Sequence, residues 1–167
     1  MSRRWPRALR LLHWLTAALV AIMIPAVLAA QALTESDTDR AEQLIGLHML
    51  CGLGVLVLTV PRLAIRLFVE APPPLETAPL LRAASSLRSP VFYALLLVIP
   101  LTGIFKLTLS GLDVTAFGQT LIRAGQTAPN LARWLNTAHA WLAWTFLALI
   151  LLHFLAASLY WVRMRKA

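Results

Sequence analysis

The chain of 167 residues is 59% hydrophobic and only 13% charged, and its mean hydropathy is +0.74. This composition excludes an ordinary soluble domain and is typical of a small helical membrane protein, here one membrane domain over residues 1–167. The net charge of +8 does not indicate nucleic-acid binding, because the basic residues flank apolar segments and form no continuous basic face. Cys51 is the single cysteine, which rules out an intramolecular disulfide and a cysteine-based metal framework.

Four apolar segments are each long enough to cross a bilayer, and they predict an all-α, four-helix transmembrane bundle. The predicted spans cover residues 11–33, 44–61, 90–110 and 136–162. Between them lie an acidic loop, a proline-rich loop over 62–89 and a glycine-containing loop over 111–135. The basic start SRRWPR, the apolar run and the stretch AAQA also fit a secretory signal, but the run is long for one and we expect it to remain as the first span.

The distribution of charge predicts the orientation of the bundle. With four spans, both termini and the proline-rich loop lie on one side of the membrane. That side carries eleven of the fifteen Lys and Arg residues, and the other side carries four of them with five of the seven acidic residues. Because positive charge is retained on the cytoplasmic side during insertion, both termini are predicted to be cytoplasmic.

All four histidines, His13, His48, His139 and His153, fall inside or at the edge of a predicted span. An ionisable side chain at membrane depth usually faces a partner, a cavity or a ligand, although a hydrogen bond to another helix explains any one of them equally well. His139 and His153 are fourteen residues apart, which places them on one helix face and about 21 Å apart along the axis. Threading the spans then pairs His13 with His153 near the inner face and His48 with His139 near the outer face.

Two imidazoles on different helices at matching depth are the arrangement that holds a planar macrocycle, and two such axial ligands give haem iron suited to electron transfer. Two depths therefore predict two haem groups rather than one zinc site, whose ligands must lie within about 2.0–2.1 Å of the ion. Two separate two-histidine metal sites stay open, but no carboxylate in the spans completes them. The third span carries no histidine and is expected to form a wall.

Basic residues at the ends of the spans can pair with haem propionates, although interfacial anchoring explains them as well. They are Arg62 and Arg66 near the inner face and Lys106, Arg123 and Arg133 near the outer face. Gly52, Gly54 and Gly103 lack side chains where a flat ligand could approach a helix, and close helix packing accounts for them equally.

Taken together, these segments resemble the bacterial cytochrome b561 family of four-helix, dihaem b-type inner-membrane cytochromes. The stretches that carry the resemblance are RALRLLHWLTAALV, GLHMLCGLGVLVLTVPRLAIRL, IPLTGIFK with Pro100 and Gly103, the pair Phe117 and Gly118, and AHAWLAWTFLALILLHFLAASLYW. The resemblance implies that the four histidines are axial ligands of two haem b groups in the bacterial inner membrane. Ala138 departs from the family, which often has an aromatic residue there.

The predicted function is electron transfer between the two haems and the quinone pool, with ubiquinone or another quinone as partner. Similar proteins oxidise quinol, or oxidise superoxide while reducing quinone, and the outer basic residues could steer superoxide as well as pair propionates. No motif marks a quinone pocket. One alternative is a cytochrome b anchor subunit of a larger dehydrogenase or hydrogenase, which needs a soluble redox partner. Another is a histidine-based metal or proton transporter, which would be colourless.

Overall fold

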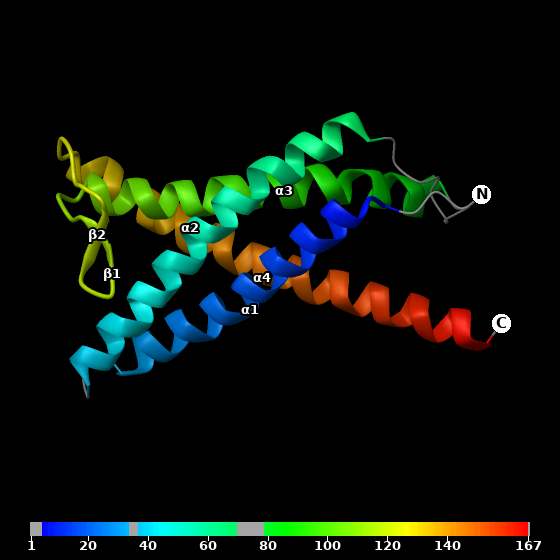
Figure 1. Cartoon of the computed structure of the whole chain (residues 1–167), viewed down its shortest axis with the longest axis horizontal. Coiled ribbons are helices and arrows are strands. Elements are labelled where there is room, and N and C mark those ends of the chain that lie inside the picture. The colour runs from blue at the N-terminus through cyan, green and yellow to red at the C-terminus, as the bar shows by residue number, and fades with distance from the viewer. Residues whose placement is uncertain (1–4, 34–36, 70–78, 167) are drawn as a thin grey trace.

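The computed structural model describes residues 5–33, 37–69 and 79–166, with the backbone alone for residues 79–88, 159–161 and 163–166. Its helices are α1 (Arg7–Leu33), α2 (Thr38–Phe68), α3 (Pro79–Thr108) and α4 (Pro129–Lys166). Each helix contains a stretch long and apolar enough to cross a membrane. The predicted membrane bundle is therefore confirmed. The start of α1 and the end of α4 lie at one end of the bundle (Figure 1).

The helices extend beyond the spans predicted from hydropathy. α2 begins earlier because Asp37 caps it, accepting a hydrogen bond from the backbone N–H of Arg40 at 3.1 Å. It also continues through Pro61 to Phe68, since one proline inside a helix removes a single backbone hydrogen bond. α4 starts at Pro129 rather than near residue 136, and proline suits the first helical position because its missing N–H is not needed there. Residues 72–74 of the proline-rich loop lie outside the described residues.

A β-hairpin lies in the segment predicted as a loop between the third and fourth spans, at the end of the bundle opposite both termini (Figure 1). Its antiparallel strands are β1 (Val114–Ala116) and β2 (Gln119–Ile122). The two turn residues, Phe117 and Gly118, have positive φ angles of 50° and 75°, as a type I′ turn requires. The hairpin lies directly against α2, because a Cβ added at Gly46 would be 3.4 Å from the Cα of Ala116.

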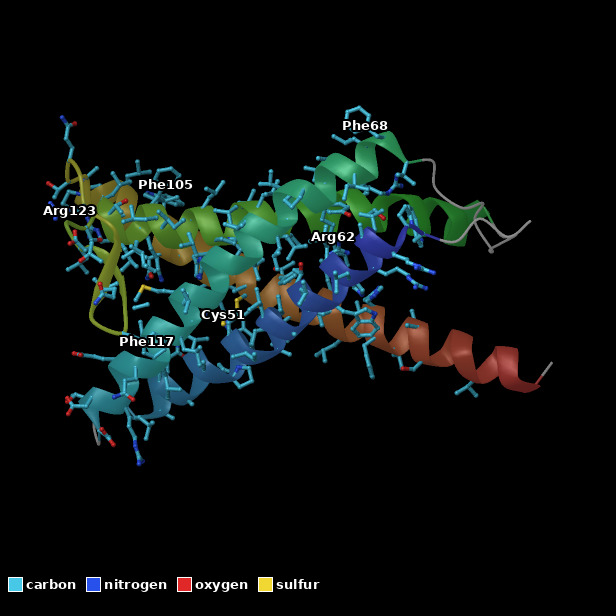
Figure 2. The ribbon with its side chains drawn as sticks, viewed as in Figure 1. Cys51, Arg62, Phe68, Phe105, Phe117 and Arg123 are labelled. Atoms are coloured by element: carbon cyan, nitrogen blue, oxygen red, sulfur yellow. The ribbon has the colours of Figure 1, made fainter. Side chains whose placement is uncertain are left out.

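The core of the bundle is a buried apolar cluster with members from all four helices. It comprises Val20, Met23, Cys51, Val55, Leu96, Ile99 and Phe146. Cys51 lies near the middle of the bundle and is a packing residue (Figure 2). The buried hydroxyls of Thr16 and Thr59 donate to the carbonyls of Leu12 and Val55, so neither needs a partner outside its own helix.

The helices pack in two close pairs, α1 with α2 and α3 with α4. α4 is the least covered helix, with 6% of its most apolar window buried against 22% in each of the other three. Its outward side chains include Trp141 and Trp144, which are 71% and 59% exposed. Apolar side chains on the outside of all four helices are what a multi-pass membrane protein presents, and α4 presents the most open of these faces.

Candidate functional site

The structure brings His48 of α2 and His139 of α4 together at the hairpin end of the bundle. Their ring centroids are 6.4 Å apart and the ring planes stand at 80°. Both side chains are half-buried. We call these two residues the hairpin-end pair. His48 and His139, which were predicted to lie at the same depth of the membrane, therefore lie next to each other on neighbouring helices.

A backbone carbonyl fixes the protonation of His48. Its Nδ1 lies 3.1 Å from the carbonyl oxygen of Met23 on α1. A carbonyl oxygen only accepts, so Nδ1 carries the proton and donates it. In the neutral ring the lone pair is then on Nε2, the nitrogen that remains for a metal. This is the arrangement usual for metal-binding histidines, whose second nitrogen is held by a carbonyl or carboxylate.

His139 is held in the same way by α3. Its Nδ1 lies 3.0 Å from the carbonyl oxygen of Ile99 and 3.1 Å from Oγ1 of Thr102, whose hydroxyl donates to that carbonyl at 2.7 Å. A Cβ added at Gly103 would be 3.1 Å from Cε1 of His139, so glycine is what lets the imidazole approach α3. Gly103 thus admits a histidine ring, where the sequence indicated a flat ligand or a packed helix.

His13 of α1 has a different partner. Nη2 of Arg62, on α2, lies 3.0 Å from its Nδ1. A guanidinium only donates, so this Nδ1 is the acceptor and the proton of the neutral ring is on Nε2. The Arg62 guanidinium also lies 5.3 Å from the centre of the Tyr93 ring, a cation–π distance. The tautomer at His13 is therefore the reverse of that at the hairpin-end pair.

His153 of α4 lies at the same end of the bundle, because its ring packs on Phe92 while Arg62, the partner of His13, lies over the neighbouring Tyr93, and we call His13 and His153 the termini-end pair. The ring of His153 is 5.6 Å from that of Phe92, and Phe92 in turn is 5.7 Å from Phe146. His153 therefore stands against an aromatic, apolar wall. Phe92 belongs to α3, the helix predicted to be a wall, and nothing in its sequence context distinguished it from other core residues.

The comparison with known families decides what class of protein holds these histidines. The profile of the prokaryotic cytochrome b561 family matches residues 4–167. The chain belongs to the prokaryotic cytochrome b561 family. A relative from Yersinia pestis, named probable superoxide oxidase CybB, is 33% identical over 115 residues, which is 68% of this chain and 65% of the relative. The match thus spans just under two thirds of that relative's length. Membership makes this protein a membrane b-type cytochrome, and the family implies haem b binding.

The hairpin-end pair in this cytochrome has the spacing that two histidines would need to hold one metal. A metal–imidazole nitrogen bond is about 2.0–2.1 Å long and the ring centre lies about 1.2 Å beyond the nitrogen, so two imidazoles on one metal would have centroids no more than about 6.4–6.6 Å apart. The separation of the two ring centroids in the structure is 6.4 Å. Within the described ranges, no three His, Cys, Asp or Glu residues gather to hold a metal ion. A metal held by these two histidines would need further ligands, and haem would supply four pyrrole nitrogens.

The basic residues predicted to pair with propionates divide into two groups. Arg62 contacts His13, and Nζ of Lys106 donates to Oδ1 of Asn136, one helical turn before His139, so these two lie near the histidine pairs. The other three lie elsewhere. Arg66 stacks on Trp5 with 5.0 Å to the ring centre, Arg133 donates to Asn130, and Arg123 is exposed after β2.

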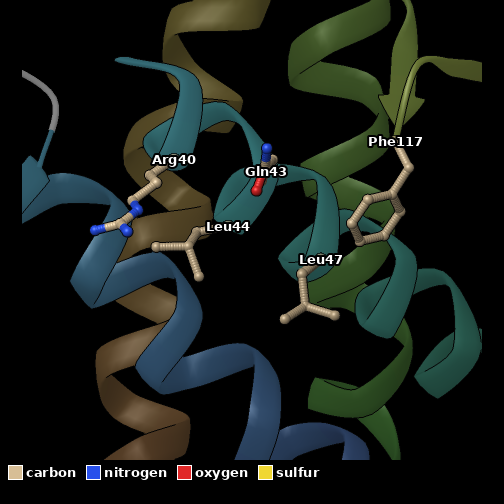
Figure 3. Close-up of a pocket in the computed structure, with 5 residues that line it drawn as sticks. All are labelled: Arg40, Gln43, Leu44, Leu47 and Phe117. Atoms are coloured by element: carbon tan, nitrogen blue, oxygen red, sulfur yellow. The ribbon is translucent and has the colours of Figure 1, made fainter. Parts of the chain in front are cut away.

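Two surface cavities lie at the hairpin end of the cytochrome. One of about 270 Å³ is lined by Arg40, Gln43, Leu44, Leu47 and Phe117, and Figure 3 shows Phe117 reaching from the hairpin toward α2, which carries the other four residues. The other, of about 300 Å³, lies between α3 and α4 and is lined by Lys106, Leu107, Ser110, Ala132, Arg133 and Asn136. No histidine lines either cavity. The second cavity brings two of the predicted outer basic residues, Lys106 and Arg133, to one recess.

Proposed function

We propose that this cytochrome binds two haem b groups and transfers electrons between them and a quinone in the membrane. His48 and His139 would hold one haem. His13 and His153 would hold the other, which requires Arg62 to leave Nδ1 of His13 so that the ring proton can move there and free Nε2. The observation that carries the proposal is the hairpin-end pair, with centroids 6.4 Å apart and Nδ1 of each ring bonded to a carbonyl. That combination leaves two Nε2 lone pairs for one metal.

Bound haem supplies one-electron redox chemistry, and the chain's residues set the conditions for it. The Met23 and Ile99 carbonyls accept from the Nδ1–H groups of His48 and His139, which orients both rings and leaves the lone pair of each neutral ring on Nε2. The apolar wall of Phe92 and Phe146 keeps water from His153. Arg62 and Lys106 provide positive charge at the two ends, where propionates would be neutralised.

Superoxide oxidation coupled to quinone reduction is the form of this function that we propose for the hairpin end. The relative's printed name supports it, as does the recess that holds Lys106 and Arg133, because positive charge raises the local concentration of an anion. We further propose that both termini are cytoplasmic and that the membrane is the bacterial inner membrane. The hairpin end then faces outward, and any soluble redox partner meets the protein there.

Haem content tests the proposal directly. Purified wild-type protein is expected to hold two haems b per chain by pyridine haemochrome assay, with low-spin visible spectra. His48→Ala and His153→Ala should each remove one haem or convert it to high spin. Leu50→Ala and Leu152→Ala are matched controls, because these neighbouring side chains are 43% and 61% exposed and should retain both haems. A colourless wild-type protein from haem-replete cells would overturn the proposed function.

A further inference from the structure

The two histidine pairs differ in whether they offer a nitrogen lone pair to a metal. At the hairpin end, Nδ1 of His48 and Nδ1 of His139 each donate to a backbone carbonyl, so Nε2 of each neutral ring keeps its lone pair. At the termini end, Nδ1 of His13 accepts from Arg62, so the proton of the neutral ring is on Nε2 and neither nitrogen is available. The hairpin-end pair therefore fits haem in this arrangement, and the termini-end pair does not.

Two contacts on different helices hold Arg62 in this position. Its Nη2 lies 3.0 Å from Nδ1 of His13 on α1, and its guanidinium carbon lies 5.3 Å from the centre of the Tyr93 ring on α3. Arg62, His13 and Tyr93 are all half-buried. A hydrogen bond from a charged donor is stronger than one between neutral groups, and a cation–π contact strengthens as the cation loses water. Removing Arg62 from His13 therefore costs free energy.

The hairpin-end pair needs no such rearrangement. Lys106 is the basic residue near this pair, but its Nζ is bonded to Oδ1 of Asn136 at 3.1 Å. The Nδ1 atoms of His48 and His139 are already bonded to carbonyls, and these bonds can stay in place while Nε2 binds a metal. The cost of releasing an arginine thus falls on the termini end of the bundle.

We propose that Arg62 blocks the termini-end pair, so that the hairpin-end pair takes up haem first and the termini-end pair takes it up only after Arg62 has left His13. This inference rests on the proposed function. In the release, the hydrogen bond from Nη2 of Arg62 to Nδ1 of His13 breaks and the ring proton passes from Nε2 to Nδ1. The imidazole is neutral before and after, so no proton is gained or lost.

Arg62→Met tests the block, because methionine is unbranched and has neither the charge nor the donor. Arg66→Met is the matched control. It removes the same charge one turn further along α2, where Arg66 donates to the carbonyl of Val69 and stacks on Trp5 instead of contacting a histidine. Tyr93→Leu is a second test, since it removes the ring under the guanidinium and leaves the bond to His13.

Two double variants isolate the pairs for the experiment. His13→Ala/His153→Ala leaves the hairpin-end pair, and His48→Ala/His139→Ala leaves the termini-end pair. Haem is added to each full-length chain, purified in detergent from haem-starved cells, and the rise of the low-spin Soret band gives the rate of uptake. The hairpin-end pair should take up haem at least about tenfold faster, since a hydrogen bond to a charged group is worth about one factor of ten or more.

The block is then removed in the chain that keeps only the termini-end pair. Arg62→Met should speed its uptake about tenfold, Tyr93→Leu about threefold, and Arg66→Met should leave it unchanged. The rate of uptake separates the block from any later pairing of Arg62 with a propionate, which would act on the release of haem. Nitrogen-15 NMR of the chain before haem addition should place the ring proton on Nε2 of His13 and on Nδ1 of His48 and His139.

Equal rates at the two pairs, faster uptake at the termini end, or an Arg62→Met effect no larger than that of Arg66→Met would overturn the inference. So would one common tautomer for His13 and the hairpin-end histidines. In each of these cases, low-spin haem in both double variants would still support the proposed function. A chain that takes up haem at neither pair would overturn both proposals.

Discussion

The two ends of the bundle hold their histidines in different ways. At the hairpin end, the Nδ1 atoms of His48 and His139 are each bonded to a carbonyl of a neighbouring helix. At the termini end, Nδ1 of His13 accepts from Arg62. Four identical side chains at two depths thus become two sites with different electronic surroundings. The difference comes from the backbone carbonyls of Met23 and Ile99 and from the guanidinium of Arg62, which contact the histidine rings but are not proposed to bind a metal.

Gly103→Val should have the largest effect and should break the hairpin end alone. The new Cβ would lie 3.1 Å from His139 Cε1, and the two further methyl groups of valine cannot fit between α3 and that ring. We expect loss of one of the two haems per chain, with the termini-end haem kept. Pyridine haemochrome stoichiometry and low-temperature visible spectra measure this. Gly125→Ala is the control, because a Cβ there meets nothing within 4 Å, and equal haem loss in both variants would refute the effect.

Phe92→Ala should weaken the termini end alone. It removes the ring that packs against His153 and Phe146, and such truncations cost about 3–5 kcal/mol when the residue is fully buried. Because Phe92 is only partly buried, we expect a loss of about 2 kcal/mol of unfolding free energy and weaker haem retention at the termini end. Thermal unfolding in detergent, followed at the Soret band, checks both. Loss of the hairpin-end haem with retention of the termini-end haem would contradict the claim that Phe92 supports the termini-end pair.

Phe117→Asn should have the smallest effect on stability and should leave both histidine pairs unchanged. Phe117 holds a positive φ of 50° in the hairpin turn, a conformation that asparagine adopts more readily. We expect a gain of about 0.5–1 kcal/mol in unfolding free energy with unchanged haem content. Leu112→Asn, an exposed position before β1 without positive φ, is the control and should give no gain. A loss of haem in Phe117→Asn would mean that the hairpin supports the histidine pair.

The bundle and the approach of His48 to His139 could be predicted from sequence because both depend on position along apolar segments. Hydropathy located four spans, and depth alone put His48 opposite His139. The hairpin was not predicted, since strands of three and four residues leave no periodic signal and the glycines of this segment indicated only a loop. The partners of Nδ1 could not be predicted either, because a carbonyl at Met23 or Ile99 is common to every residue and only tertiary packing selects it.

The pairing of the histidines is the central claim, and two double variants test it most directly. Each variant removes two histidines. His48→Ala/His139→Ala removes one proposed pair whole, and His48→Ala/His13→Ala removes one member of each pair. The first is expected to keep one low-spin haem b with two histidine ligands, and the second is expected to keep none, as read from the electron paramagnetic resonance spectrum of the oxidised protein. Equal low-spin haem in both variants, or more in the second, would contradict the account.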